Sequence, residues 1–195
     1  MAAALLAPIA LPAAAEEKLF VGVPSGWTQG WQQSEPDRST VEYVPPGETA
    51  QNWTEMVTIQ EYRGAQVDPL TYLDKLIEKF GAGCQAARHM GPRAGEENGY
   101  KAAVAYMECK GPDPATAEPG VTLKNIEFMA VKAIQGREGL HLVERAWHAD
   151  DIAQHPLNQP GAADWVSVVR DAELCDMKDL TQTCRSIGRT GNLTQ

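Results

Sequence analysis

The chain has 195 residues, of which 26 are acidic and 17 basic, so its formal net charge is −9. This length fits one compact domain. Hydrophobic residues make up 43% of the chain, enough for a core, which excludes wholesale disorder. The acidic balance argues against a nucleic-acid partner, because such proteins contact phosphates through clustered Lys and Arg. No apolar stretch approaches the roughly 20 residues that span a bilayer, so no transmembrane anchor is expected.

The first fifteen residues predict export. Residues 1–15 contain no charged side chain and end in three alanines, directly before Glu16, Glu17 and Lys18. Small residues at these positions suit the pockets of a signal peptidase, and the segment is too short for an anchor. We therefore predict a signal peptide over 1–15, a single domain over 16–174, a C-terminal tail over 175–195, and a periplasmic or secreted location.

Residues 19–62 predict a succession of strands. Short apolar or alternating runs at 19–21, 27–33 and 39–44 are separated by turn residues. The clearest pattern covers residues 53–62, where Trp53, Val57 and Ile59 fall on one face and polar residues on the other. A period of two indicates a half-buried strand.

The clearest helix is predicted over residues 69–81. Asp68 can cap the first free amides, and proline is tolerated at the first helical position. Apolar residues then recur at helical spacing, and glycine ends the segment. The members of this stripe are Leu70, Leu73, Leu76, Ile77 and Phe80. The glycines of the following G-x-G-x-x-A pattern at 81–86 come after a helix, whereas dinucleotide binding needs them before one, so no cofactor is predicted.

The four cysteines, Cys84, Cys109, Cys175 and Cys184, predict two disulfides. No pair has the Cys-x-x-Cys spacing of a redox centre or zinc site. A turn signal covers 95–99. A turn centred between Glu96 and Glu97 lies midway between Cys84 and Cys109, so an antiparallel hairpin would bring those two within bonding distance. Cys175 and Cys184 then pair in the tail.

The rest of the chain completes the predicted fold. A strand over 100–109 and a loop over 111–120 precede a long hairpin, 122–134 with 140–148, and a second amphipathic helix over 162–172. Because strands and helices do not alternate as βαβ units, the sequence predicts an α+β fold in which amphipathic helices cover an antiparallel sheet.

This order of elements resembles the Mog1/PsbP/DcrB-like fold group. The shared opening pattern is Val23-Pro24-Ser25-Gly26-Trp27, and the similarity covers about 19–174. Two further segments, 43–49 and 52–56, resemble a part of uncharacterised exported proteins of Gram-negative bacteria. The resemblance implies an α/β sandwich and a small binding or assembly protein, and it assigns no catalytic residue.

A cluster of histidines and acidic residues near position 150 is the one candidate metal site. His148, Asp150, Asp151 and His155 could ligate a metal if the loop folded back on itself. The alternative is that they are solvated polar residues where a strand runs into an acidic loop. No His-Glu-x-x-His motif supports a metal enzyme.

Trp27 and Trp31 form a candidate binding surface, because residues four apart on a strand share a face. Aromatic pairs suit partner recognition, although core packing is the alternative. We therefore predict an exported, non-enzymatic protein that binds a protein partner or an envelope component. Two alternatives remain open at this stage: a metal-binding protein or enzyme, and a small-ligand or lipid carrier with an apolar pocket between sheet and helices.

Overall fold

The computed structural model describes residues 16–116, 119–179, 181–182 and 184, and the predicted signal peptide lies outside them. Strands dominate this part of the chain. They are β1 (Glu17–Phe20), β2 (Thr28–Ser34), β3 (Arg38–Val44), β4 (Glu55–Arg63), β5 (Cys84–Glu97), β6 (Tyr100–Pro112), β7 (Ile126–Gln135), β8 (Gly139–Ala149) and β9 (Glu173–Asp176). The helices are α1 (Pro69–Ala82) and α2 (Ala162–Arg170), with short 3-10 turns η1 (Pro114–Thr116), η2 (Ile152–Gln154) and η3 (Pro156–Asn158).

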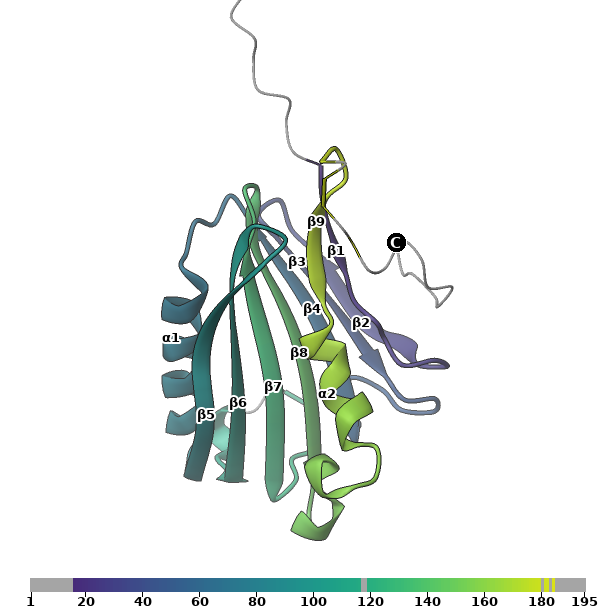
Figure 1. Cartoon of the computed structure of the whole chain (residues 1–195). Helices are drawn as coiled ribbons and strands as arrows, with labels where there is room; N and C mark the ends of the chain where they lie inside the picture. The colour runs from purple at the N-terminus through teal and green to yellow at the C-terminus, as the bar shows by residue number, and fades with distance from the viewer. Residues whose placement is uncertain (1–15, 117–118, 180, 183, 185–195) are drawn as a thin grey trace, which may run out of the picture.

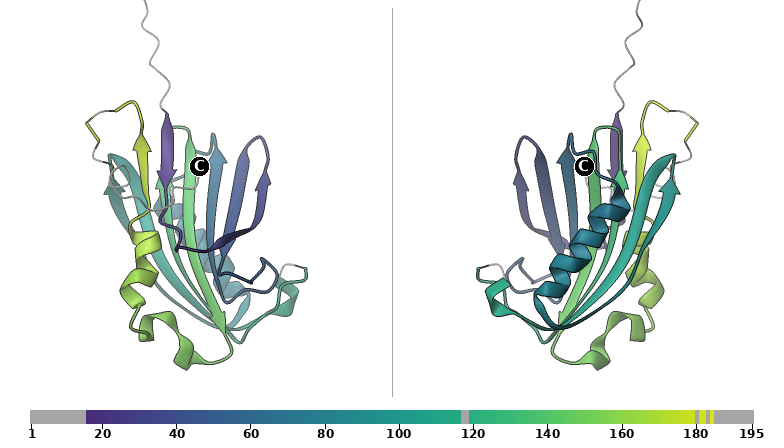
Figure 2. Two further views of the ribbon diagram at one scale, coloured as in Figure 1. Left: turned by 90° about the vertical axis from the view of Figure 1, so that its right-hand side faces the viewer. Right: turned by 90° about the vertical axis from the view of Figure 1, so that its left-hand side faces the viewer.

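Seven strands form one antiparallel sheet in the order β2-β3-β4-β8-β7-β6-β5. Helix α1 connects β4 to β5 and so carries the chain from the middle of the sheet to its far edge (Figure 1). Side chains alternate between the two faces of each strand. We call these the α1 face and the α2 face, after the helix that packs on each; the opposite views in Figure 2 bring first α2 and then α1 towards the reader.

Helix α1 confirms the element predicted over 69–81. The Asp68 carboxylate accepts hydrogen bonds from Leu70 N (3.1 Å) and Thr71 N (3.2 Å), which satisfies amides that lack a partner within the helix. The apolar stripe packs over β5, β6 and β7, and Leu73 is fully buried. This half of the α1 face is thus a conventional apolar core.

Helix α2 confirms the second predicted helix, with its end at Arg170, and it lies on the opposite face over β7 and β8. Trp165, Val168 and Val169 are its buried residues. They join a cluster that contains Phe128 of β7 and Trp147 of β8.

The predicted fold class is wrong, because the protein is mostly β. The strands of the large sheet have 7 to 14 residues each, whereas α1 has 14 residues and α2 only 9. Two such helices cannot cover both faces of seven strands. Non-helical segments cover the remainder: Ala50 and Trp53 pack against Val44 and Met56 on one face, and Val21 and Val23 pack onto the other. The helical periodicity of the sequence predicts the two helices. It does not predict which loops pack on the sheet.

A second, two-stranded sheet joins the start of the described chain to its end. Strand β1 pairs with β9, which crosses the domain boundary predicted at 174. The Glu17 carboxylate accepts hydrogen bonds from the backbone N of Arg137 (2.8 Å) and Glu138 (3.0 Å), which ties this sheet to the β7–β8 turn.

Among the helices described here, none combines the length and apolar character needed to cross a bilayer.

The β5–β6 hairpin is present, but its turn is Asn98-Gly99 and is not centred between Glu96 and Glu97 as predicted. Both turn residues have positive φ (50° and 80°), the conformation that favours Asn-Gly in two-residue hairpins. A register shift between Met90 and Arg93 lies farther along the pair. The predicted antiparallel hairpin is therefore confirmed, but its turn lies two residues later than predicted.

Candidate functional site

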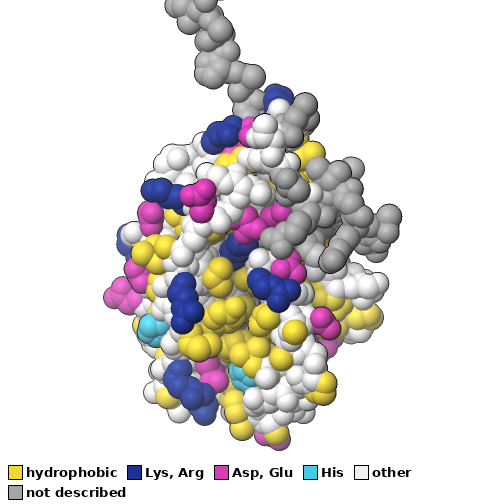
Figure 3. Space-filling view, in the orientation of Figure 1, with side chains coloured by type: hydrophobic (Ala, Val, Ile, Leu, Met, Phe, Trp, Pro, Cys, Tyr) yellow, Lys and Arg dark blue, Asp and Glu magenta, His cyan; other side chains and the backbone are white. Residues whose placement is uncertain are grey.

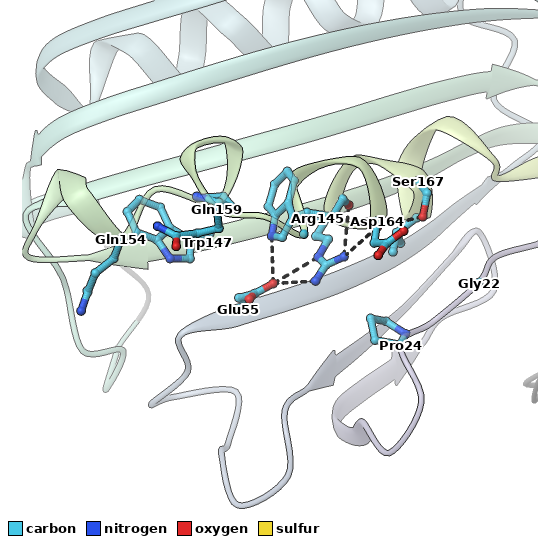
Figure 4. Close-up of a pocket in the computed structure, with 13 residues that line it drawn as sticks. Gly22, Pro24, Glu55, Arg145, Trp147, Gln154, Gln159, Asp164 and Ser167 are labelled. Atoms are coloured by element: carbon cyan, nitrogen blue, oxygen red, sulfur yellow. Dashed lines mark hydrogen bonds and ion pairs between the residues drawn. The ribbon is translucent and has the colours of Figure 1, made fainter.

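A pocket of about 570 Å³ opens beside α2 on the α2 face of the sheet (Figure 4). Its walls come from β4, β8, the η2–η3 segment, α2 and the chain before β2. The lining residues are Gly22, Pro24, Glu55, Arg145, Trp147, Gln154, Pro156, Gln159, Gly161, Asp164, Trp165, Ser167 and Val168. The volume lies within the roughly 300–1,000 Å³ range that is usual for small-molecule sites.

An ion pair between Arg145 and Glu55 lies in this pocket. Arg145 donates from Nη2 (2.7 Å) and Nε (3.2 Å) to Oε2 of Glu55. Trp165 Nε1 donates to the same oxygen at 2.8 Å. Figure 4 shows Glu55 and Arg145 pointing towards each other beneath α2. All three of these bonds end on Oε2. The other carboxylate oxygen, Oε1, makes no hydrogen bond within the described part of the chain.

Arg145 also holds α2 itself. Its Nη1 donates to the backbone carbonyl of Trp165 at 3.1 Å, and its guanidinium lies 5.3 Å from the ring of Trp27 and 5.1 Å from that of Trp165. An arginine between two indole rings gains cation–π attraction as well as charge pairing. The Arg145 side chain is only 9% exposed, so the cation is fixed before any ligand arrives.

A second buried cation, Lys132 of β7, holds the end of α2. Its ammonium pairs with Glu97 and donates to the carbonyls of Arg170 (3.2 Å) and Ala172 (2.5 Å). Carbonyls at a helix C-terminus carry partial negative charge, so a cation there is favourable. The position of α2 on the sheet therefore depends on charges from two strands as well as on apolar packing.

The polar groups of the pocket are arranged to bind. Gln154, Gln159 and Asp164 add amide and carboxylate groups to its lining. The Ser167 hydroxyl donates to the carbonyl of Asp164 at 2.8 Å, and among the described residues no base lies within hydrogen-bonding distance of its oxygen. An activated serine needs such a base. The geometry thus provides fixed donors and acceptors around a charged pair, and aromatic walls.

The structure does not bring the four predicted metal ligands together. His148 stacks on Trp53, with ring centroids 3.8 Å apart, and its Nε2 hydrogen-bonds the carbonyl of the same residue. Burial lowers the pKa of His148, which favours the neutral ring. Asp150 pairs with Lys124 at 3.1 Å, and this hydrogen bond lowers the pKa of the carboxyl.

The other two candidate ligands also have structural roles. Asp151 caps η2 by accepting from Ala153 N at 2.9 Å. His155 accepts from Leu157 N at 3.2 Å and packs against Phe128 and Trp147, so it lies on the α2 face, whereas strand alternation places His148 on the other. Across the part of the chain that the structure describes, no three His, Cys, Asp or Glu side chains form a metal-binding group.

Trp27 and Trp31 do not share a face. The register of β2 against β3 shifts between Gln29 and Trp31, which leaves Gly30 as an extra residue. A bulge of this kind reverses the alternation beyond it. Trp27 therefore packs on the α2 face over Arg145, while Trp31 points to the α1 face and is 39% exposed.

Both disulfides have the predicted pairing. Cys84 joins Cys109 with Cα atoms 5.5 Å apart, and Cys175 joins Cys184 at 6.4 Å. In the register, however, Cys84 lies opposite Pro112 and Cys109 opposite Ala87, so the first bond crosses the strand pair diagonally. The geometric reason given from the sequence was therefore incorrect, although the pairing was right.

The sequence reasoning missed Arg145, Glu55, Trp165 and Lys132 as a unit. A signal for two of them was present. Lys132 and Arg145 alternate with apolar residues that face the core, such as Ala130 and Val143, and a charge on the core side of a strand needs a partner. The partners themselves, 90 residues from Arg145 in the case of Glu55, carry no local pattern.

Comparisons with known proteins give little beyond this geometry. No family model matches the chain, and no curated protein matches it. Among solved structures, the chain is similar to the crystal structure of LpqN, a protein involved in cell envelope biogenesis of Mycobacterium tuberculosis. The match has 13% identity, a TM-score of 0.46, and covers 84% of this chain and 86% of that one. The resemblance to the Mog1/PsbP/DcrB-like group therefore stays a prediction.

Proposed function

We propose that the protein is an exported, non-enzymatic binding or assembly protein of the bacterial envelope, and that it binds through the pocket beside α2. The observation that carries this proposal is the Arg145–Glu55 pair, which Trp165 and Trp27 hold in place within an open pocket. Polar groups fixed in advance lose little conformational entropy when a ligand arrives. One carboxylate oxygen, Glu55 Oε1, is left for that ligand.

Export is supported by the cysteines and by the leader. Four cysteines form two disulfides, the state expected of proteins that mature outside the reducing cytosol. The uncharged, alanine-rich segment over 1–15 has the composition of a signal peptide. On this proposal the cysteines brace the fold and take no part in redox chemistry.

Binding is favoured over catalysis because two groups of the pocket that could react, Glu55 Oε2 and the Ser167 hydroxyl, already make hydrogen bonds within the described chain. Oε2 of Glu55 accepts hydrogen bonds from Arg145 and Trp165, and the Ser167 hydroxyl is used within α2. A general base has to be within reach of the proton that it removes and at a suitable pKa.

A small-ligand carrier is the second candidate, and the pocket volume favours it. The site lies between sheet and helix, as that alternative requires, and it could hold one small molecule. Its lining mixes charged and amide groups with aromatic rings, so the ligand would be polar on at least one side. An apolar lipid chain suits this lining poorly.

The proposal can be tested with a photo-crosslinking amino acid at Gln159, on the rim of the pocket, in cells that export the protein. Ser167→Trp fills the pocket from α2, and Ala163→Trp is the matched control, because Ala163 is exposed on the same helix and does not line the pocket. We expect a specific adduct that Ser167→Trp abolishes and Ala163→Trp leaves unchanged. Its mass distinguishes a protein from a small molecule.

Two results would contradict the proposal. One is the absence of any specific adduct at position 159 when the exported protein is abundant. The other is an adduct that survives Ser167→Trp, since a ligand outside the pocket is not displaced by a side chain that fills it.

A further inference from the structure

The sheet carries a second surface on the other flank of α2. Helix α1 covers β5 and β6 on one face, and α2 packs over β7 and β8 on the other. On the α2 face of β6, Tyr100 and Glu108 are buried, and the part between them is only half covered. Met90 on β5 lies directly opposite Tyr106 on β6. Met90 is 58% exposed, more than any other large hydrophobic residue of the described chain. With half-buried Val104 and Tyr106 it forms the centre of what we call the β5–β6 patch.

The rim of the β5–β6 patch is basic. Arg88 and Arg93 follow the same face of β5, opposite Glu108 and Val104, and Arg170 at the end of α2 interacts electrostatically with Tyr106. Figure 3 shows an apolar hollow near the middle of this face, with dark-blue side chains around it. The chain as a whole has a net charge of −9, so a surface where arginines gather differs in charge from the rest of the protein.

The three arginines differ in what neutralises them. Arg88 pairs with Glu108 at 2.5 Å, and Arg170 pairs with Asp171 at 2.8 Å. Arg93 has no acidic partner among the residues that the structure describes. Its neighbour across the strand pair is Val104, so the charge stands at the edge of the apolar centre. Arginine, tyrosine and methionine around an apolar centre are the residue types enriched at protein interfaces.

We propose that the β5–β6 patch binds an acidic amphipathic segment of a protein partner. The argument is charge complementarity combined with shape. The apolar face of such a segment would cover Met90, Val104 and Tyr106, while its carboxylates would meet Arg93 and the outer edges of Arg88 and Arg170. A bilayer fits less well, because the apolar area of this face is hollowed near its middle (Figure 3), and a narrow segment can fill a hollow that a bilayer surface would span.

This surface is separate from the pocket, so the two proposals fail independently. The pocket lies between α2 and β4, and its lining contains no residue of β5 or β6. Ser167→Trp is therefore expected to leave binding at the β5–β6 patch unchanged. A partner that engages both surfaces would straddle α2.

The test measures fluorescence anisotropy of two labelled amphipathic peptides with one leucine face, which carry either glutamate or lysine on the other face. We expect the glutamate peptide to bind and the lysine peptide not to. Arg93→Glu and Met90→Glu should each weaken binding about tenfold. Lys75→Glu is the matched control, since it makes the same charge change as Arg93→Glu on exposed α1, on the opposite face. Circular dichroism checks that every variant is folded.

Several outcomes would overturn the proposal. Equal binding of both peptides, no binding of the glutamate peptide, or equal effects of Arg93→Glu and Lys75→Glu would exclude a specific acidic partner. Flotation with phosphatidylglycerol vesicles that depends on Arg93 would assign the patch to a membrane surface. A dimer in sedimentation velocity that Arg93→Glu dissociates would assign it to a second copy of the chain.

Discussion

The two helices of this protein are attached to the same sheet in different ways. Helix α1 lies on an apolar stripe whose centre is the fully buried Leu73. Helix α2 is shorter, and two buried cations from the strands below, Arg145 and Lys132, donate to the carbonyls of Trp165 and Arg170 within it. In the first arrangement the contacts between helix and sheet are mainly apolar. The second places a charged pair and open space next to a helix, which is what a binding site requires.

The largest expected effect follows from breaking the polar attachment of α2. Arg145→Met leaves the Glu55 carboxylate partly buried without its partner, which should lower the free energy of unfolding by about 3–5 kcal/mol. Urea denaturation measures this loss. Adding Glu55→Gln removes the stranded charge, so the double variant should recover part of it. Equal stability of Arg145→Met and the natural protein would show that α2 does not depend on this ion pair.

The comparable change under α1 is Leu73→Ala. Truncation of a fully buried leucine should lower the free energy of unfolding by about 2–5 kcal/mol. Its consequence for binding should differ from that of Arg145→Met. The adduct at position 159 should persist in Leu73→Ala at temperatures where the protein is folded, whereas Arg145→Met should abolish it. Loss of the adduct in both variants would mean that the helices are not independent in function.

A smaller effect is expected at the start of α1. Asp68→Ala removes the side chain that accepts from Leu70 N and Thr71 N, which should lower the free energy of unfolding by about 1 kcal/mol. Asp74→Ala is the control, because Asp74 is exposed within the same helix. Similar stability of the two variants in thermal unfolding would contradict a specific capping role.

The last effect concerns pH and the α1 face beyond the helix. Burial raises the pKa of Glu127 and of Glu144 to about 7, with mutual repulsion contributing at Glu144. Carboxyls whose pKa is raised on folding bind more protons in the folded state, so their contribution to stability falls as pH rises from about 4.5 to about 7. The folded protein therefore gains from protonation of these groups at the acidic end of this range.

Glu144→Gln removes one of these titrations. The melting temperature at pH 8 should rise relative to that at pH 5, because a glutamine at this position has no proton to lose between those values. Glu78→Gln on exposed α1 is the control. Burial lowers the pKa values of His141 and His148, so their contribution to the stability of the protein is lost as pH falls below 6.5. Both variants keep these histidines, so this contribution is the same in each. An unaltered pH profile in Glu144→Gln would contradict the raised pKa.

The same contrast explains what the sequence could and could not predict. Helix α1 follows from a cap and an apolar stripe, both of which are local, and both disulfide partners were assigned correctly. The orientation of Trp31 was not predictable from spacing alone, because one bulged residue, Gly30, reverses a face. The fold class was misjudged because loops such as the one containing Trp53 cover sheet area without any periodic signal. The pocket depends on Glu55 and Arg145, which only the tertiary pairing of β4 with β8 brings together.

The most direct measurement of whether binding uses α2 is hydrogen–deuterium exchange on the exported protein, purified with and without the species captured at position 159. We expect that species to slow exchange in Ala162–Arg170 and in the η2–η3 segment, with Pro69–Ala82 unchanged. Protection confined to α1, or no change in α2, would contradict a binding site beside that helix.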